Sequence, residues 1–292
     1  MRILVTGSAG HLGEALMRTL RVQGRAALGL DIVASDFTDV VGSIVDRECV
    51  RRCMQEVDGV LHTATLHKPH VATHSRQEFV DTNISGTLNL LEAAHVRGMR
   101  AFVFTSTTST FGDAMAPGAG QPAVWINEEV PPISKNIYGA SKLAAEDLCQ
   151  LFARNQGLAC VVLRTSRFFP EPDDDPALRA HFADGNIKLN ELLYRRADIS
   201  DLVDAHLLAI DRAPTIGFGR YVLSAPTPFS RSDLQALRSD APAALARYFP
   251  QFQSIYSKRG WHMFPGIDRV YDSALACREL GWKPFYDFAR GL

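Results

Sequence analysis

The chain has 292 residues, of which 46% are hydrophobic and 22% charged, and its formal net charge is −1. This is the composition of an ordinary globular protein, long enough for one large domain or for a main domain with a smaller partner. The near-neutral charge excludes a broad basic face, so we expect no nucleic-acid partner, and no apolar run is long enough to predict a membrane span. The five cysteines form no C-x-x-C pair, and the chain enters a strand without a leader-like segment. We therefore expect a cytoplasmic protein.

The first elements are a short apolar strand, a helix that starts inside a glycine-rich turn, and a second strand. The turn has glycine at every third position, namely Gly7, Gly10 and Gly13. Glycines permit a tight turn and the close approach of a pyrophosphate, and the free N–H groups at a helix start bind phosphate. Asp31 ends the second strand, where a carboxylate accepts both hydroxyls of a ribose and repels a 2′-phosphate. This order predicts a Rossmann-type site for NAD.

Strands and helices continue to alternate as far as Arg164. We expect a short helix capped by Asp46, strands at 57–64, 101–105 and 158–164, helices at about 83–96 and 138–155, a polar loop at 65–76 and a long surface loop at 113–136. The alternation predicts an α/β fold of the Rossmann type, a doubly wound and mostly parallel sheet with helices on both faces.

The regular pattern stops after Arg164, at a stretch rich in proline and aspartate. We therefore divide the chain into an NAD-binding Rossmann domain, residues 1–164, and a smaller C-terminal substrate-binding part, residues 165–292. In the second part we expect helices at about 201–211, from 230 onward and at 273–280, and a strand near 220–224 that returns to the main sheet.

Tyr138 and Lys142 are four residues apart and share one face of the expected helix. A neighbouring cation favours phenolate and should lower the tyrosine pKa from about 10. Such a tyrosine can pass a proton to or from a substrate hydroxyl while a hydride moves to or from nicotinamide. The Ser/Thr-rich strand end at 105–109 offers a hydroxyl that can hold the same oxygen. The pattern therefore predicts oxidation and reduction of a substrate hydroxyl.

Together these residues resemble the extended short-chain dehydrogenase/reductases, and more narrowly the NAD-dependent epimerase/dehydratase family. The resemblance covers residues 1–164, and the segment 278–284 is similar to the family's closing segment. It implies an enzyme that uses NAD on a sugar or nucleotide-sugar. It also implies a homodimer formed through the helices near 83–97 and 138–155.

The resemblance also implies roles for individual residues. The family's catalytic hydroxyl stands four residues before an aromatic-glycine pair, here Phe111-Gly112, which implies Thr107. Tyr138 would be the acid/base, Lys142 would bind the nicotinamide ribose and tune Tyr138, and Asn83 would be structural. The cofactor-binding set is Gly7, Gly10, His11, Leu12, Gly13, Asp31, Ser43, Ile44, Thr63, Ala64, Thr65, Asn83, Thr105, Tyr138 and Lys142. The substrate-binding set is Thr107, Thr108, Ser166, Arg167, Arg179 and Arg196.

The chain departs from the family pattern at two places. Gly42-Ser43-Ile44 stands where the family often has Gly-Asp-(Ile/Leu) against adenine. After Leu163-Arg164, where sugar-nucleotide 4-epimerases have an aromatic-Asn pair, this chain has Thr165-Ser166-Arg167, then a Pro-Glu-Pro and Arg179. That pattern is similar to the uronate dehydrogenase branch, whose substrate is a free sugar acid.

Three functions stay open: an epimerase that returns the hydride, a dehydrogenase that releases NADH, and a catalytically silent NAD(H)-binding regulatory protein. The intact Thr107, Tyr138 and Lys142 disfavour the third.

The remaining polar residues have less specific patterns. His67, His70 and His74 have no acid or cysteine at ligand spacing, so we expect no metal site, and they could line the substrate entrance. His62 follows a strand and should pack near the cofactor rather than react. Arg195 and Arg196 could bind a substrate anion or pair with Asp198.

Overall fold

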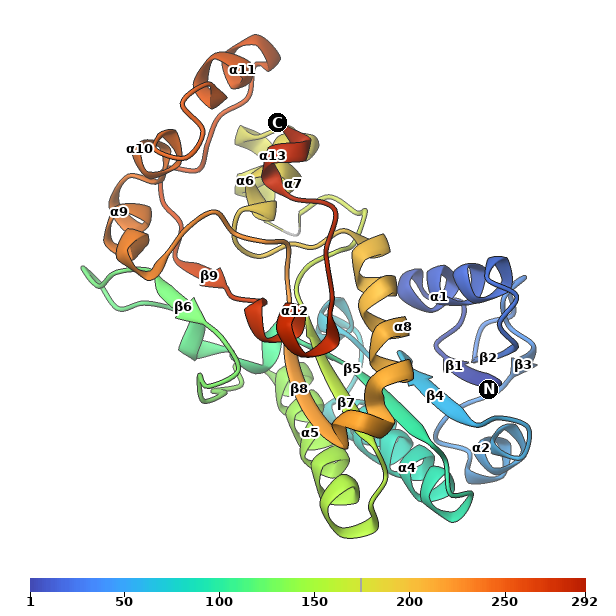
Figure 1. Ribbon diagram of the computed structural model, residues 1–292. Helices are drawn as coiled ribbons and strands as arrows, with labels where there is room; N and C mark the ends of the chain where they lie inside the picture. Colours follow the sequence, from blue (N-terminus) through green and yellow to red (C-terminus); the bar gives the residue numbers. More distant parts are fainter. Residues whose placement is uncertain (174) are drawn as a thin grey trace.

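The structure, a computed structural model, describes residues 1–173 and 175–292. A seven-stranded sheet with the order β3-β2-β1-β4-β5-β7-β8 forms its centre (Figure 1), and every neighbouring pair in it is parallel. Its strands are β1 (Ile3–Thr6), β2 (Ala27–Asp31), β3 (Val40–Val41), β4 (Gly59–His62), β5 (Ala101–Thr107), β7 (Cys160–Thr165) and β8 (Phe218–Leu223). The expected Rossmann-type parallel sheet is confirmed, and the strand expected near 220–224 is the edge strand β8.

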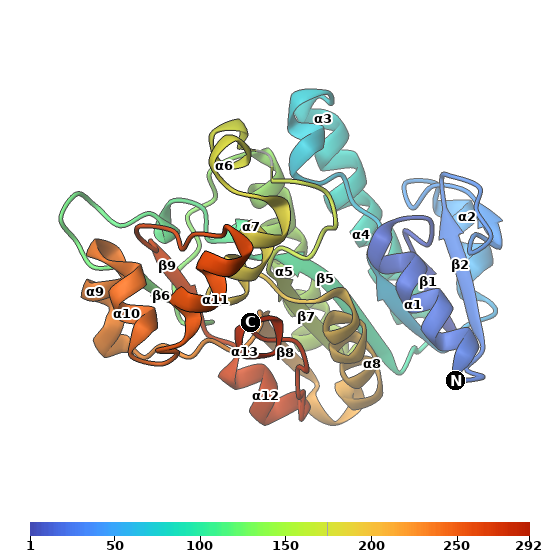
Figure 2. The same cartoon turned by 90° about the horizontal axis from the view of Figure 1, so that it is seen from above.

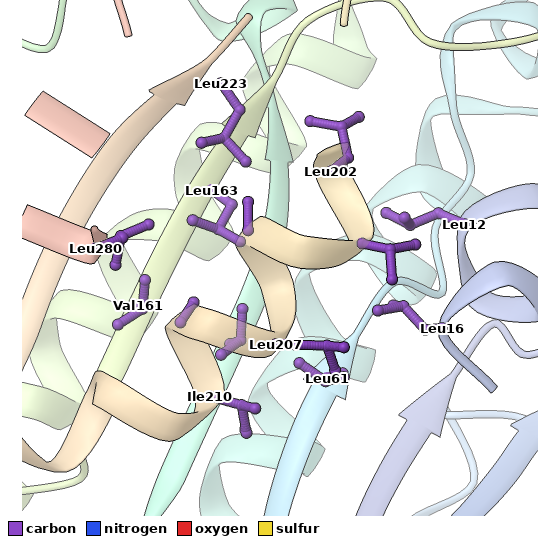
Figure 3. Close-up of a cluster of buried hydrophobic side chains, with 14 of the residues drawn as sticks. Leu12, Leu16, Leu61, Val161, Leu163, Leu202, Leu207, Ile210, Leu223 and Leu280 are labelled. Atoms are coloured by element: carbon purple, nitrogen blue, oxygen red, sulfur yellow. The ribbon is translucent and has the colours of Figure 1, made fainter. Parts of the chain in front are cut away.

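Helices cover both faces of this sheet. The helices up to β7 are α1 (His11–Val22), α2 (Arg47–Met54), α3 (Arg76–Phe79), α4 (Gly86–Val96) and α5 (Ile137–Gln156). Those after β7 are α6 (Pro176–His181), α7 (Asp184–Leu192), α8 (Ile199–Ile216), α9 (Leu234–Ser239), α10 (Ala241–Ala246), α11 (Phe252–Arg259), α12 (Ala274–Leu280) and α13 (Phe288–Gly291). One face packs against α1, α8 and α12 (Figure 3), and the other packs against α2, α4 and α5.

Strand β5 illustrates how the sequence supplies both layers. All seven of its residues are buried, and successive side chains of a strand point to opposite faces. Val103 packs in the cluster of α1 and α8, whereas Phe102 and Phe104 pack with α4 and α5. Because both faces need apolar residues, the first four residues of β5, 101–104, are a continuous apolar run rather than an alternating one.

The C-terminal part has a hydrophobic core of its own, which α7, α9, α10, α11 and α13 build together with the strand pair β6 (Val124–Ile126) and β9 (Arg269–Tyr271). In Figure 1 these helices lie above the main sheet, and seen from above (Figure 2) α9, α10 and α11 lie on the opposite side of the molecule from α1 and α2. The segments that leave the carboxyl ends of β5, β7 and β8 lead into this part. Among the described residues, no helix combines the length and the apolar character that crossing a membrane requires.

Several element boundaries differ from the sequence expectations. The helix expected from about 83 is preceded by α3 and a π-helical turn, Val80–Ser85. A capping box between Ser75 and Glu78 starts this earlier helix, and it was overlooked in the sequence. The expected surface loop at 113–136 contains β6, because its short apolar run pairs with β9, far along the chain. The expected polar loop at 65–76 contains a 3₁₀ helix, Lys68–Ala72.

Candidate active site

The glycine turn has the geometry of a phosphate cradle. Gly7 has a φ of +73°, and a Cβ there would lie 2.7 Å from the Ala64 nitrogen. A Cβ on Gly13 would lie 1.9 Å from the Gly7 carbonyl oxygen, so only glycine lets α1 pack this closely on the turn. A Cβ on Gly10 would meet nothing nearer than that same carbonyl at 3.4 Å. The turn is therefore open beside Gly10, at the start of α1, where N–H groups lack helical acceptors.

The two side chains that follow Gly10 have different surroundings. His11 Nε2 lies 2.5 Å from a carboxylate oxygen of Glu171, on the surface. Leu12 is buried in the core beneath α1 (Figure 3). Leu12 can thus contribute to a phosphate site only through its backbone N–H group, whereas the exposed His11 also offers its ring.

Asp31 links the end of β2 to the glycine turn. Its carboxylate accepts hydrogen bonds from the backbone N–H groups of Ala9 and Val33, both at 2.9 Å. A carboxylate offers about four acceptor positions, so two remain for the hydroxyls of a ribose. Two further cofactor-binding candidates follow β3. Ser43 Oγ accepts a hydrogen bond from the Val45 N–H, and Ile44 is only 5% exposed and packs on Gly86. The placement of Ile44 in the core argues against an adenine contact through its side chain.

The segment after β4 is held by hydrogen bonds to its own neighbours. Thr63 Oγ1 donates to the Thr6 carbonyl at 2.7 Å, and the Ala64 N–H donates to Thr6 Oγ1. Thr65 Oγ1 donates to Asn83 Oδ1 at 3.0 Å. The Asn83 side chain also bonds to both backbone groups of Leu66, so it anchors the segment after β4. Thr105, by contrast, directs its hydroxyl to His206 Nε2 at 2.8 Å, toward α8.

Tyr138, Thr107 and Lys142 come together where β5 and α5 meet. Asn136 caps α5 by accepting the Gly139 N–H, so Tyr138 lies in the first turn. Tyr138 is 8% exposed and hydrogen-bonds to Thr107, whose Oγ1 also accepts from the Ser109 N–H at 3.1 Å. Lys142 is 2% exposed, and its ammonium lies 4.1 Å from the centre of the Phe104 ring. Among the described residues this ammonium has no hydrogen-bond or ion-pair partner.

Burial controls the protonation of this pair. It raises the pKa of Tyr138 to about 12, which the Thr107 hydrogen bond offsets only in part. It lowers the pKa of Lys142 to about 7, against the opposing field of Glu146. The expectation that Lys142 lowers the Tyr138 pKa is therefore wrong for the protein alone. The cost of burying either charge is larger than their mutual influence.

One charged group near the site was missed in the sequence. Glu146 is fully buried one turn beyond Lys142, and it binds Ser106 Oγ at 2.5 Å and Arg164 Nε at 3.0 Å. Arg220 of β8 adds an ion pair at 2.9 Å. The spacing of Lys142 and Glu146 along one helix face was the available clue. The cluster ties α5 to β5, β7 and β8.

On the substrate side, the structure groups arginines with buried acids. Arg196 pairs with Glu191 at 2.7 Å, Arg195 pairs with the same carboxylate at 2.8 Å, and Arg167 pairs with Asp173 at 3.0 Å. Of the two alternatives for Arg195 and Arg196, the ion pair with Asp198 is not formed among the described residues, because Asp198 is instead the N-cap of α8.

The other three substrate candidates differ in exposure. Ser166 follows β7 directly and is 3% exposed, and its hydroxyl has no hydrogen-bond partner among the described residues. Thr108 is 7% exposed and begins the turn after β5. Arg179 is exposed on α6 and donates to the Asp173 carbonyl. Ser166 and Thr108 thus lie at the carboxyl edge of the sheet, whereas Arg179 lies farther out along the chain.

His67, His70 and His74 form a row of ring contacts, with centroids 4.4 Å and 5.0 Å apart, and Phe169 stacks on His67. Within the parts of the chain that the structure describes, no group of three potential metal ligands comes together. The row packs against the segment after β7, close to the expected substrate entrance.

Comparison with known proteins identifies the class. The model of the NAD dependent epimerase/dehydratase family matches residues 3–222, so the chain belongs to this family of extended short-chain dehydrogenase/reductases. The expected family, enzyme class and cofactor are confirmed.

The proteins named below are 25% to 28% identical to this chain over the aligned residues. UDP-glucose 4-epimerase of Azospirillum brasilense is 28% identical over all of this chain and 89% of its own length. Uronate dehydrogenase of Pseudomonas syringae pv. tomato is 28% identical over 59% of this chain and 62% of its own. A short-chain dehydrogenase/reductase superfamily protein from Agrobacterium tumefaciens, solved with bound NAD, has a TM-score of 0.71 at 25% identity over 100% of this chain and 95% of its own.

Proposed function

We propose that this enzyme oxidises and reduces a hydroxyl-bearing carbon of a sugar, with Thr107, Tyr138 and Lys142 as the reacting group of residues. The observation that carries the proposal is the burial of the Tyr138 hydroxyl beside Thr107, with the unpaired Lys142 ammonium one helical turn away. The Thr107 and Tyr138 hydroxyls are thereby placed to hold one substrate oxygen. The Lys142 ammonium is placed to bind a different group.

The residues present fit NAD. The turn beside Gly10 leaves room for a pyrophosphate, Asp31 has acceptor positions left for a ribose, and Lys142 is a buried cation without a partner. A buried ammonium is costly unless hydrogen-bonded, and ribose hydroxyls would supply the missing acceptors. When bound, NAD supplies the hydride acceptor and a positively charged ring, which favours the phenolate of a neighbouring tyrosine.

Tyr138 changes role with the direction of the reaction. Because burial raises the pKa of Tyr138 to about 12, its hydroxyl is protonated at neutral pH. In this form Tyr138 can donate a proton to a keto oxygen as that carbon is reduced. In the oxidising direction the phenolate takes the proton from the substrate hydroxyl, while Thr107 holds the same oxygen.

The substrate half favours an anionic sugar. Three arginines, Arg167, Arg195 and Arg196, gather around two acids, Asp173 and Glu191. The buried Nε of Arg195 also lacks a hydrogen-bond partner among the described residues. The phosphates of a nucleotide-sugar or the carboxylate of a sugar acid would complete such a cluster.

A fluorescence assay tests the proposal and separates its two versions. The purified protein is mixed with NAD and with two panels, one of free sugars and uronic acids and one of nucleotide-sugars. Net NADH with a sugar acid would establish a dehydrogenase. A changed sugar configuration by NMR without net NADH would establish an epimerase. Tight NAD binding without turnover on either panel would overturn the proposal and favour a silent regulatory protein.

We also propose a cytoplasmic homodimer that pairs through α4 and α5. The outer face of α5 supports this, because it carries a shallow surface groove with an apolar stripe among polar residues, lined by Ala144, Asp147, Leu148, Gln150, Leu151 and Arg154. An apolar groove on a helix surface suits a helix of a second copy. Light scattering at micromolar concentration should give twice the monomer mass, and a monomer would contradict the proposal.

A further inference from the structure

His62 occupies a fully buried polar position beside the active site. It ends β4 and is 1% exposed. Its Nδ1 lies 2.8 Å from Thr6 Oγ1 of β1, and its Nε2 lies 3.0 Å from Thr87 Oγ1 of α4. The buried imidazole, with a hydroxyl at each nitrogen, thereby links β1 to α4.

The neighbouring hydrogen bonds fix the direction of every proton in this group. Thr87 donates its hydroxyl proton to the Asn83 carbonyl at 2.7 Å, so it can only accept from His62 Nε2. Thr6 Oγ1 accepts the Ala64 N–H at 3.3 Å and can therefore donate to His62 Nδ1. His62 is thus a neutral ring with its proton on Nε2. A second proton on the ring would remove the acceptor that the Thr6 hydroxyl has among the described residues.

The chain of bonds continues from Asn83 to the catalytic helix. The Asn83 amide donates to the Leu66 carbonyl and to Ser141 Oγ, both at 2.9 Å. Its oxygen accepts from the Leu66 N–H at 2.9 Å and from Thr65 Oγ1. Ser141 in turn donates to the Tyr138 carbonyl at 3.0 Å. Both donors and both acceptor positions of Asn83 are used, so its orientation is determined by its surroundings.

The ring of Phe104 lies beside both the His62 ring and the Lys142 ammonium. The His62 ring lies 5.4 Å from the Phe104 centroid, and the Lys142 ammonium lies 4.1 Å from it. Burial, reinforced by the Lys142 charge, holds the pKa of His62 well below its usual value. A neutral His62 therefore avoids repulsion with Lys142 and keeps both ring nitrogens available in fixed roles.

We propose that neutral His62 is a positioning residue, which together with Thr87 and Asn83 holds the Thr63–Leu66 segment and the start of α5 in one fixed arrangement. The hydrogen-bonded residues His62, Thr87, Asn83 and Ser141, called the relay below, join the segment after β4 to the start of α5. These two elements are far apart along the chain. The effect of this arrangement on catalysis rests on the function proposed above. The hydrogen-bonding pattern is independent of that function.

The first test measures the protonation state and the tautomer of the His62 ring. In ¹⁵N-histidine NMR at pH 7, the His62 signals, assigned by their loss in His62→Gln, should be those of the neutral Nε2–H form. In Thr87→Val the Nε2–H loses its acceptor, and the ring should shift toward the Nδ1–H form. A charged ring or an Nδ1–H form in the unmodified protein would overturn the inference. This measurement needs no substrate.

The second test follows backbone amides and turnover together. Thr87→Val should speed hydrogen exchange at the Ala64 and Leu66 amides, because the group that anchors both is loosened. It should lower kcat by roughly 10- to 100-fold, since small displacements of reacting groups are costly, while KM stays within about threefold. Thr87→Ser keeps the hydroxyl and should restore both exchange and kcat.

The matched control is Leu90→Val on the same helix, which shortens a buried apolar side chain outside the relay. It should leave kcat and both amides within about twofold of the unmodified protein, since it removes only packing. Equal effects of Thr87→Val and Leu90→Val would reduce the relay to a packing role and overturn the inference. If the unmodified protein turns over no sugar, the proposed function fails, and the NMR and exchange results still decide the relay. If Thr87→Val does not fold, the ¹⁵N spectrum of the unmodified protein decides.

Discussion

The NAD-binding half and the substrate half bury their polar side chains differently. Among the described residues, the solvent-shielded side-chain nitrogen and oxygen atoms without a hydrogen-bond partner belong to the part after residue 164, apart from Arg164 Nη1 and the Lys142 ammonium in the NAD-binding half. Before that point, His62 and Asn83 have their hydrogen-bonding positions filled by neighbouring hydroxyl, amide and backbone groups. After it, Ser166 and Arg195 have groups left over.

The difference indicates where each half depends on a ligand. A complete network is rigid, and it suits a site that holds the same cofactor in every turnover. Unfilled buried groups are costly, and a ligand that fills them recovers that cost on binding. The substrate half therefore holds the groups that would distinguish one sugar from another.

The largest expected effect is on kcat and follows a change at Tyr138 in the NAD-binding half. Tyr138→Phe removes one hydroxyl and keeps the ring, so kcat should fall by roughly 10²- to 10⁴-fold, the range typical of a lost acid/base group. The NADH dissociation constant, measured by fluorescence titration, should stay nearly unchanged. A comparable loss of both would mean that Tyr138 mainly supports the fold.

A change in the charged cluster should act on stability instead. Glu191→Gln leaves Arg195 and Arg196 with little compensation in a buried setting. Removing one partner of a buried ion pair typically costs about 3 to 5 kcal/mol of unfolding free energy. Urea denaturation measures this loss, with Glu14→Gln at the exposed Arg18 pair as the matched control. A loss no larger than that of the control would make the two halves alike in this respect.

Lys142 predicts a pH dependence with a definite sign. Because burial lowers its pKa from 10.5 to about 7, the unfolded chain binds an extra proton between these values. The destabilisation is complete below about pH 7 and fades as the pH rises to 10.5, by at most about 1.4 kcal/mol per pH unit. Lys142→Met should therefore gain most stability over the unmodified protein near pH 7, and the gain should shrink toward pH 10. A gain that grows with pH would contradict the buried, unpaired cation.

The smallest expected effect concerns cofactor choice. Asp31→Ala removes the carboxylate that would repel a 2′-phosphate, and the preference for NAD over NADP should fall by about tenfold, equivalent to one lost charge-assisted contact. Binding titrations with both nucleotides measure the ratio. Since Asp31 also accepts two backbone N–H groups, Asp31→Asn is the control that keeps a hydrogen-bonding side chain. An unaltered ratio in both variants would exclude the ribose role.

Local sequence patterns predicted the NAD-binding half in most of its elements. Glycine spacing, strand runs and the Tyr138–Lys142 interval all depend on neighbours within a few residues, and the sheet and α5 formed where these patterns placed them. The substrate half was predicted less completely. Its short helices α7, α10 and α11 were not anticipated, because six to nine residues carry too little periodicity to distinguish a helix from a loop.

The sequence by itself determined the family, the cofactor class and the alternation of parallel strands with helices along the chain, because these follow from short-range spacing. Only the tertiary structure decided that β6 pairs with β9, that Arg195 and Arg196 choose Glu191 over Asp198, and that burial rather than Lys142 controls the Tyr138 pKa. Pairing across long separations and the depth of burial depend on which surfaces meet. A one-dimensional pattern does not contain that information.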